Sequence, residues 1–223
     1  MLLQSIKLTN FLSFGDSNQA VELLPLNIVI GPNGSGKSNL IESIELIRST
    51  PKDLLIPIRD GGSVRDWLWK GAPKKNPVAT IDAVFNNPKR PSALRYAFSF
   101  TEVSQRFEII DERIENEQPD VGHDQPYFYY RFENGHGILN VKGKERHLQH
   151  EEIESTSSIL SQRKDPDQYP ELTYLGNTFL KIRTYREWSF GRYTTPRLPQ
   201  KTDLPNDLLE SDASNLGWCL TLT

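Results

Sequence analysis

The segment Gly31–Ser38, GPNGSGKS, constrains the fold more than any other stretch of this chain, because it matches the pattern G-x-x-x-x-G-K-[ST] at each fixed position. Leu26–Ile30, just before it, is a short apolar run rich in β-branched residues, which predicts a strand buried on both faces. After it, apolar residues recur at helical spacing: Leu40, Ile41, Ile44 and Ile47. Pro51 disfavours helix at Thr50 and predicts the helix end. The predicted order is strand, glycine-rich loop, helix.

This arrangement is typical of a loop that binds the phosphates of a nucleotide. Its glycines let successive backbone N–H groups point inward and form a concave anion site, and the following helix adds its positive end. In that geometry Lys37 reaches the β- and γ-phosphates and stabilises transition-state charge, while the Ser38 hydroxyl binds Mg²⁺. The residues predicted to contact the nucleotide are Gly31, Asn33, Gly34, Ser35, Gly36, Lys37, Ser38 and Asn39.

Composition narrows the class of protein. The chain has 223 residues, is 25% charged and carries a net charge of −3. No apolar run approaches the ~18 residues of a membrane span, and the first residues lack the features of a secretory signal, so we expect a cytoplasmic protein without a membrane segment. The one cysteine, Cys219, excludes an internal disulfide framework and a cysteine-rich zinc site. The histidines at 123, 136, 147 and 150 lack the spacing of a metal site.

From residue 79 onward the hydrophobic period changes to two, as in Leu94, Tyr96, Phe98 and Phe100. This alternation, with Asn134–Gly135 as a hairpin signal, predicts an antiparallel β-meander over 79–148. Residues 2–11 and 21–24 read as a further pair of strands, and two later segments read as helices: 151–163 and 171–183.

The opening IKLTNFLSF and the segment GPNGSGKSNLIESIEL resemble the RecF/SMC-like branch of ABC-type ATPases. The later strings SQRKDPDQYPEL and YREWSFGRY resemble stand-alone, AAA-labelled predicted ATPases of the RecF-like type, so the resemblance covers essentially the whole chain. It implies ATP and Mg²⁺ as cofactors, with ATP held between the P-loop of one head and the signature motif of another. It also implies a signature motif, a Walker B strand ending in Asp-Glu, and a switch histidine downstream of the β-lobe.

The chain departs from that pattern, because no LSxG[EQ] string follows the P-loop and the last residues, SNLGWCLTLT, read as an element cut short. We therefore interpret the fold as α/β, with a P-loop NTPase core and an antiparallel β-lobe over 79–148, forming an incomplete ABC-type head. Residues 1–223 would be one N-terminal nucleotide-binding domain of a longer, truncated ATPase. Without a signature motif we expect no ATP-dependent homodimer of this chain.

Three local features leave alternatives open. Asp111 and Glu112 in FEIIDE superficially resemble a Walker B end, but Glu108 interrupts the apolar run and the string lies within the meander, so we predict that they are not catalytic. The resemblance implies that Gln162 is the glutamine that meets Mg²⁺; it is equally a solvated residue at a helix end. Phe11 and Phe14 could line the adenine side, but core packing is favoured.

A fourth feature is the segment 181–201, which carries six bases and one acid among Tyr185, Trp188, Phe190 and Tyr193. Bases among aromatic rings can grip phosphates and stack nucleobases. The same pattern describes a strand with an aromatic inner face, and we favour that structural interpretation.

Three functions are compatible with these observations. The first is an ATP-hydrolysing motor or switch that serves DNA repair or anti-phage defence in the intact protein, with DNA or a nuclease as partner. The second is a non-hydrolysing module whose nucleotide state controls association with a partner head or nuclease. The third is a P-loop kinase, which the antiparallel meander disfavours. Because we identify no catalytic base or second carboxylate for Mg²⁺, we expect slow or absent turnover in this chain.

Overall fold

The structure, a computed structural model, describes residues 2–16, 19–71, 77–88, 90–133, 135–186, 191–199, 209–210 and 212–220. The chain divides into two compact units, Met1–Leu180 and Lys181–Thr223. The strands are β1 (Leu3–Thr9), β2 (Ala20–Glu22), β3 (Ala79–Phe85), β4 (Leu94–Val103), β5 (Arg106–Asn116), β6 (Phe128–Glu133), β7 (His136–Val141) and β8 (Lys144–Leu148). The helices of the first unit are α1 (Lys37–Ser49), α2 (Leu55–Asp60), α3 (Val64–Trp67), η1 (His150–Glu152), α4 (Ile159–Gln162) and α5 (Pro170–Leu180). The second unit contains η2 (Thr195–Arg197) and α6 (Leu216–Leu220).

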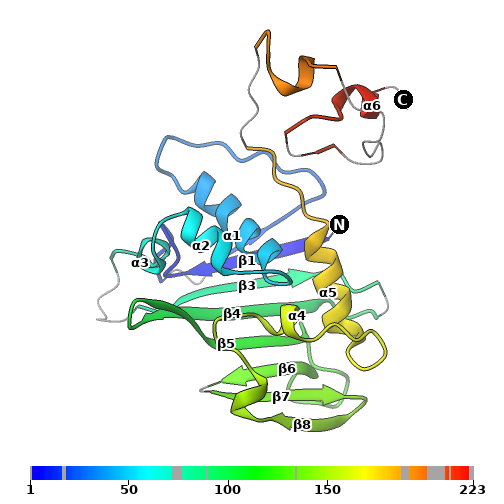
Figure 1. Cartoon of the computed structure of the whole chain (residues 1–223). Helices are drawn as coiled ribbons and strands as arrows, with labels where there is room; N and C mark the ends of the chain where they lie inside the picture. The colour runs from blue at the N-terminus through cyan, green and yellow to red at the C-terminus, as the bar shows by residue number, and fades with distance from the viewer. Residues whose placement is uncertain are drawn as a thin grey trace. The chain divides into compact units, whose positions relative to one another are not determined.

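All eight strands of the first unit form one antiparallel sheet in the order β2-β1-β3-β4-β5-β6-β7-β8 (Figure 1). The predicted antiparallel meander is therefore confirmed, since β3 to β8 are sequential neighbours. The predicted pairing of the first two strands is also confirmed, with Ile6 opposite Val21. Gly135, at φ 84°, follows β6 and allows the tight reversal into β7. The assignment of 1–223 to one nucleotide-binding domain stays a prediction.

The core lies on the sheet face that α1, α4 and α5 cover (Figure 1). Alternate residues of β4 point to this face, and Tyr96, Phe98 and Phe100 are completely buried there. Phe179 of α5 packs against them, with its ring 4.7 Å from that of Phe85 and 5.4 Å from that of Tyr96. Burying each such ring contributes about 1.5–3 kcal/mol, so this aromatic layer fixes α5 on the sheet.

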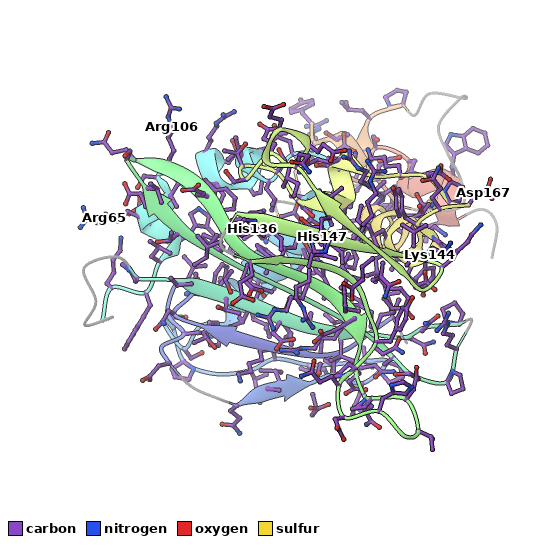
Figure 2. The ribbon with its side chains drawn as sticks, turned by 90° about the horizontal axis from the view of Figure 1, so that it is seen from below. Arg65, Arg106, His136, Lys144, His147 and Asp167 are labelled. Carbon is purple, nitrogen blue, oxygen red and sulfur yellow. The ribbon has the colours of Figure 1, made fainter. Side chains whose placement is uncertain are left out.

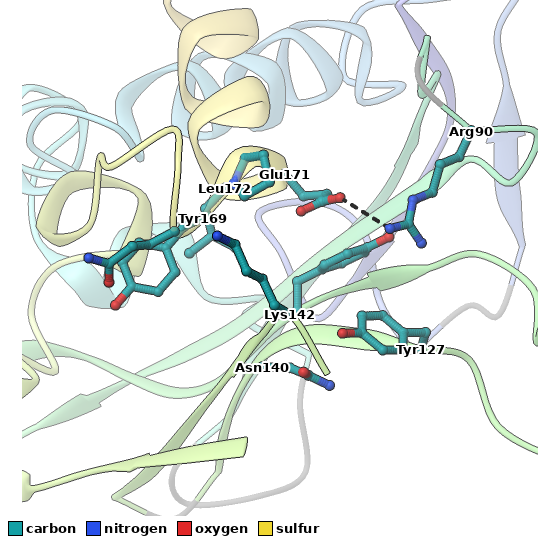
Figure 3. Close-up of a pocket in the computed structure, with 10 residues that line it drawn as sticks. Arg90, Tyr127, Asn140, Lys142, Tyr169, Glu171 and Leu172 are labelled. Atoms are coloured by element: carbon teal, nitrogen blue, oxygen red, sulfur yellow. Dashed lines mark ion pairs between the residues drawn. The ribbon is translucent and has the colours of Figure 1, made fainter. Parts of the chain in front are cut away.

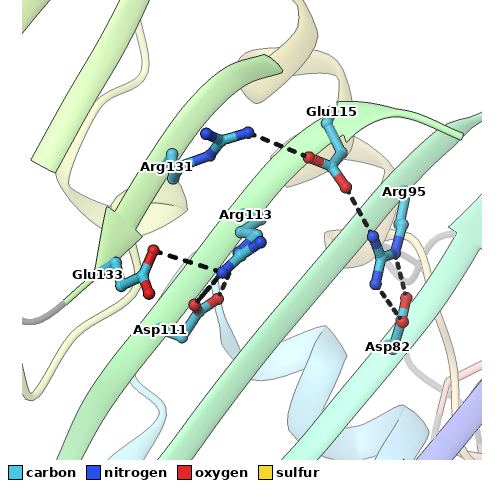
Figure 4. Close-up of polar contacts among 7 residues, drawn as sticks. All are labelled: Asp82, Arg95, Asp111, Arg113, Glu115, Arg131 and Glu133. Atoms are coloured by element: carbon cyan, nitrogen blue, oxygen red, sulfur yellow. Dashed lines mark hydrogen bonds and ion pairs between the residues drawn. The ribbon is translucent and has the colours of Figure 1, made fainter. Parts of the chain in front are cut away.

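The opposite face of the sheet is charged, because the intervening residues of the same strands point to it (Figure 4). Arg95 of β4 binds Asp82 of β3 through two hydrogen bonds of 2.7 and 2.9 Å and Glu115 of β5 at 2.7 Å. In β5, Arg113 binds Asp111 at 2.7 Å. These pairs are partly buried, and the Glu115 side chain is only 5% exposed. A one-residue slip would move their charges to the apolar face, so they specify the strand register.

Two helix predictions need correction. In α1 the buried residues are Leu40, Ser43, Leu46 and Ile47, whereas Ile41, predicted to face inward, is 45% exposed. The predicted helix over 151–163 is wrong except for η1 and the single turn of α4, since residues 153–158 are irregular. By contrast, α5 confirms most of the helix predicted over 171–183.

Candidate nucleotide-binding site

The predicted phosphate loop joins an irregular segment to α1. Gly34 and Gly36 have φ angles of 81° and 89°, the left-handed region that favours glycine. Gly36 is the residue that caps α1, and a Cβ added there would lie 2.9 Å from Ser13 Oγ and 3.4 Å from the Phe14 ring. The turn thus requires glycine at 36 for two reasons, its backbone conformation and the close approach of the loop that follows β1.

Lys37 is the first residue of α1, and its side chain bends back over this loop. Its ammonium donates to the carbonyl oxygens of Gly31 at 2.8 Å and Pro32 at 2.7 Å, and to Ser35 Oγ at 3.4 Å. The ammonium and the positive end of a 13-residue helix therefore lie beside the same loop. These residues fit a phosphate group. The Lys37 ammonium is held by neutral oxygens, and it can exchange them for a charged phosphate oxygen, which binds an ammonium more strongly.

The other predicted contact residues differ in their surroundings. Ser38 is exposed, and its hydroxyl has no hydrogen-bond partner among the described residues, so it fits the role of a single Mg²⁺ ligand. Asn33, Gly34 and Ser35 are also exposed at the loop. Asn39 instead donates through Nδ2 to Ser13 Oγ at 2.8 Å. Ser13 was not predicted, because nothing in its local sequence indicates that it joins the loop after β1 to α1.

That loop, residues 10–16, is rigidly built. Phe11 and Phe14 exchange backbone hydrogen bonds of 2.8 and 2.9 Å, and Trp69 donates its backbone N–H to Asn10 O at 2.9 Å. Phe11 is completely buried, with its ring 5.8 Å from that of Trp67. The core-packing interpretation of Phe11 is therefore confirmed. Phe14 is half-buried, with its ring against Gly36, so it lies at the edge of the phosphate loop.

The buried strand predicted before the loop is wrong. Leu26–Ile30 is irregular, and none of its backbone N–H or C=O groups bonds another described backbone group. Leu26, Ile28 and Ile30 are 79%, 81% and 85% exposed. A β-branched apolar run forms a strand only where neighbouring strands provide hydrogen bonds and cover. The antiparallel sheet of β1–β8 does not reach this segment.

The prediction that FEIIDE is not a Walker B strand is supported by its place in the structure. Asp111 and Glu112 lie in the middle of β5, between antiparallel neighbours. Asp111 binds Arg113 on the charged face. Glu112 points to the core, is 1% exposed, and accepts hydrogen bonds from Ser158 Oγ at 2.5 Å, Tyr96 OH at 2.8 Å and the Ile159 N–H at 3.0 Å. Burial raises the pKa of Glu112. Its function is therefore to hold the start of α4.

Gln162 ends α4, and its amide is engaged locally. Its Oε1 accepts from the Glu154 N–H at 3.1 Å, and its Nε2 donates to the carbonyl of Ser157 at 2.9 Å and to that of Glu154 at 3.2 Å. The amide thereby closes the irregular segment before α4. A role at Mg²⁺ requires Gln162 to release these bonds, and that role stays a prediction.

The basic segment 181–201 belongs to the second unit and is described only over 181–186 and 191–199. Residues 183–186 are not a strand, so the strand interpretation fails there; Trp188 and Phe190 lie outside the described residues. Tyr193 is 81% exposed and Arg192 lies 5.8 Å from the centre of its ring. Tyr185 donates to Leu209 O at 2.7 Å.

In the described ranges, no cluster of three or more histidine, cysteine or acidic side chains is arranged to hold a metal ion. His136 and His147 lie on the neighbouring strands β7 and β8, with exposed side chains (Figure 2). Likewise, none of the helices in the described part of the chain has the length and apolar character needed to cross a membrane.

Comparison with known proteins supports the sequence resemblance. The family model described as "AAA domain, putative AbiEii toxin, Type IV TA system" matches residues 26–207. The chain is also similar to proteins named chromosome partition protein Smc. It is 33% identical over 108 residues to that of Xanthomonas oryzae pv. oryzae and 31% identical over 113 residues to that of Coxiella burnetii. These matches cover 47% and 49% of this chain but 9% of each relative, so the chain spans a small fraction of their length.

The matched range begins at the segment before the phosphate loop and extends through the β-lobe, α4 and α5 into the second unit. The predicted resemblance to SMC/RecF-like ABC-type ATPases is thereby confirmed. A P-loop NTPase fold and a nucleotide-binding role follow from this assignment. Because the match covers well over half of its residues, the chain belongs to the AAA-domain ATPase family that includes the AbiEii-like proteins.

Proposed function

We propose that this chain binds Mg²⁺ and ATP at Gly31–Ser38 and hydrolyses the nucleotide slowly or not at all. The observation that carries the proposal is the Lys37 ammonium, which lies 2.7–2.8 Å from two carbonyl oxygens of the loop, beside the positive end of α1. ATP would supply the γ-phosphate, and Mg²⁺ would supply the positive charge that polarises it. Lys37 would bind the β- and γ-phosphates, Ser38 would bind the metal, and the loop amides would hold the phosphate oxygens.

The proposal of weak turnover rests on the acidic residues of the described chain. Asp111 forms an ion pair with Arg113, and Glu112 accepts hydrogen bonds from Ser158 and Ile159. Neither lies at the end of a strand parallel to the one expected before the loop. No other acidic pair in the described ranges follows such a strand, so a base for the attacking water has to come from elsewhere.

We further propose that the chain is part of an incomplete ABC-type head. The backbone groups of the exposed apolar run Leu26–Ile30 pair with no described backbone group, and its β-branched composition suits a strand with parallel neighbours. A second lobe that supplied those strands would cover the run and could carry the missing carboxylates. In that complete head the activity would be ATP hydrolysis coupled to DNA repair or defence, with DNA or a nuclease as partner.

The alternative is a non-hydrolysing module whose nucleotide state controls association with a partner head or nuclease. It fits the described residues better than a hydrolysing ATPase does, because they present a phosphate loop without an acidic pair placed for catalysis. A P-loop kinase is disfavoured, since the eight strands of the first unit are antiparallel. A cytoplasmic location and the absence of an ATP-dependent homodimer stay predictions.

The test is calorimetric titration with ATP and Mg²⁺, with phosphate release measured on the same sample. Lys37→Ala should weaken ATP binding, whereas Lys52→Ala, which removes the same charge just beyond the other end of α1, should not. Unchanged affinity in Lys37→Ala would mean that the loop is not the site. Phosphate release at an ordinary rate, lost in Lys37→Ala, would contradict the proposal of weak turnover. Sedimentation with and without ATP tests for the homodimer.

A further inference from the structure

A pocket lies at one end of the β-lobe, where the loop between β3 and β4, the start of β6, the end of β7 and the start of α5 meet (Figure 3). The pocket has a volume of about 110 Å³. Its walls carry the aromatic rings of Tyr127 and Tyr129, the cations Arg90 and Lys142, and the amide of Asn140. None of these residues belongs to the phosphate loop, and all of them belong to the first unit.

The aromatic part of the pocket is preorganised. Tyr129 is 4% exposed, and its hydroxyl donates to Asn116 Oδ1 at 2.8 Å. The Tyr127 ring packs edge-on against it, with ring centres 5.1 Å apart. Tyr127 is only half-buried, and its hydroxyl has no hydrogen-bond partner among the described residues. The Tyr129 ring is thus held in place at the base of the pocket, and the Tyr127 ring presents a partly exposed surface that can stack on a planar ligand.

The two cations differ in their state of pairing. Arg90 lies 3.8 Å from Glu171 Oε1 and over the Tyr129 ring at 5.8 Å, so its charge is partly compensated. Lys142 is exposed and makes neither an ion pair nor a hydrogen bond with any described residue. Figure 3 shows Lys142 extending toward the first turn of α5, on the opposite side of the pocket from Arg90. The rim therefore offers an uncompensated positive charge to an anion.

The amide of Asn140 also lines the pocket. Its Oδ1 is buried and has no partner among the described residues. Because that oxygen has almost no accessible surface, a ligand in the pocket does not reach it. The groups that face a ligand are therefore the Tyr127 ring and the Lys142 ammonium, which has no partner among the described residues.

We propose that this pocket binds one nucleotide, with its base on Tyr127 and its phosphate on Lys142. Stacking on tyrosine and phosphate contact by lysine are the features by which proteins bind single-stranded nucleic acid.

The same nucleotide chemistry could come from a free mononucleotide or from one unit of a single strand. Two probes separate these sources: CMP, titrated by calorimetry, and a fluorescent oligodeoxycytidine of about 10 nucleotides, followed by anisotropy. An abasic oligomer of the same length keeps the phosphates but removes the bases. Tighter binding of the oligomer than of CMP assigns the pocket to a single strand, and equal binding per nucleotide assigns it to the mononucleotide.

The variants test the pocket itself. Tyr127→Leu keeps an apolar side chain but removes the ring, and should weaken binding of the cytidine probes by about 5- to 150-fold. Lys142 has a φ of 52°, which asparagine tolerates, so Lys142→Asn removes the charge without straining the turn. It should lower the slope of log K against log salt by about 0.7. Lys144→Asn, two residues away and outside the pocket, is the matched control.

Lys37→Ala separates this site from the phosphate loop, because binding of the cytidine probes should survive that substitution even if ATP binding is lost. If the chain does not bind ATP at the phosphate loop, the measurement of nucleotide binding at this pocket can therefore still be interpreted. The proposal is overturned if neither cytidine probe binds, if the abasic oligomer binds as tightly as the cytidine oligomer, or if Tyr127→Leu and Lys142→Asn both bind like the Lys144→Asn control.

Discussion

Replacement of Glu112 by alanine tests the best-defined polar contact of the core. The carboxylate accepts three hydrogen bonds, from Ser158, Tyr96 and the backbone of Ile159, and it is 1% exposed. After its removal the Tyr96 and Ser158 hydroxyls can bond each other, because they already lie 3.2 Å apart. The Ile159 N–H and one hydroxyl hydrogen would then remain without an acceptor.

Each buried donor left without an acceptor costs about 1–3 kcal/mol. Two such groups would cost about 2–6 kcal/mol, and the removal of a desolvated charge offsets part of this. We therefore expect Glu112→Ala to lower the free energy of unfolding by about 2–4 kcal/mol. Urea denaturation followed by tryptophan fluorescence, to which the buried Trp67 contributes, measures the change.

Glu133→Ala is the matched control, because it removes the same charge from the neighbouring strand. The Glu133 side chain is 54% exposed and lies 3.6 Å from Arg113, so its loss should cost less than about 1 kcal/mol. If Glu112→Ala costs no more than Glu133→Ala, the carboxylate does not hold α4, and the structural role assigned to Glu112 is wrong.

Three further predictions follow from the same structure. Because burial raises the pKa of Glu112 above its ordinary value of 4.5, its contribution to stability is complete below that pH and is lost as the pH rises through the folded-state pKa. With rising pH, the free energy of unfolding of the natural chain should therefore fall relative to that of Glu112→Gln, as measured by urea denaturation. A difference that stays constant with pH contradicts the raised pKa. Gly36→Ala forces φ 89° on a residue with a Cβ, so it should cost about 1–2 kcal/mol and weaken ATP binding in calorimetry, whereas Gly122→Ala, at φ 88° with open space, should keep ATP affinity. Equal ATP affinity in both variants would argue against the tight approach of Ser13 to Gly36. Ile28→Ser should change stability by less than about 0.5 kcal/mol because Ile28 is 81% exposed, and a loss above about 2 kcal/mol in thermal unfolding would show that the segment packs as a buried strand.

Local patterns predicted most of the sheet. The period of two from residue 79 onward identified an antiparallel meander, because alternate side chains of β3–β6 divide between the aromatic core and the charged face. The glycine pattern also identified the phosphate loop and the start of α1, since Gly34 and Gly36 adopt the left-handed conformations that such a turn requires. In each case the decisive forces act between residues close in the chain.

The errors arose where the outcome depends on distant partners. The run at 26–30 has the composition of a strand, but it remains irregular because no described strand pairs with it. The segment 151–163 contains helix formers, yet hydrogen bonds from Gln162 and to Glu112 hold most of it in an irregular path. Neither partner could be identified from spacing alone.

The sequence by itself determined the phosphate loop, the alternation of the meander and the family, because these depend on residue types at short and regular spacing. Only the tertiary structure decided that Glu112 supports α4 rather than a metal, that Ser13 contacts Asn39, and that Tyr127, Asn140 and Lys142 line one pocket. The physical reason is that hydrogen bonds and burial between elements far apart in the chain depend on how the sheet and helices pack, and local spacing does not say which distant residues will meet.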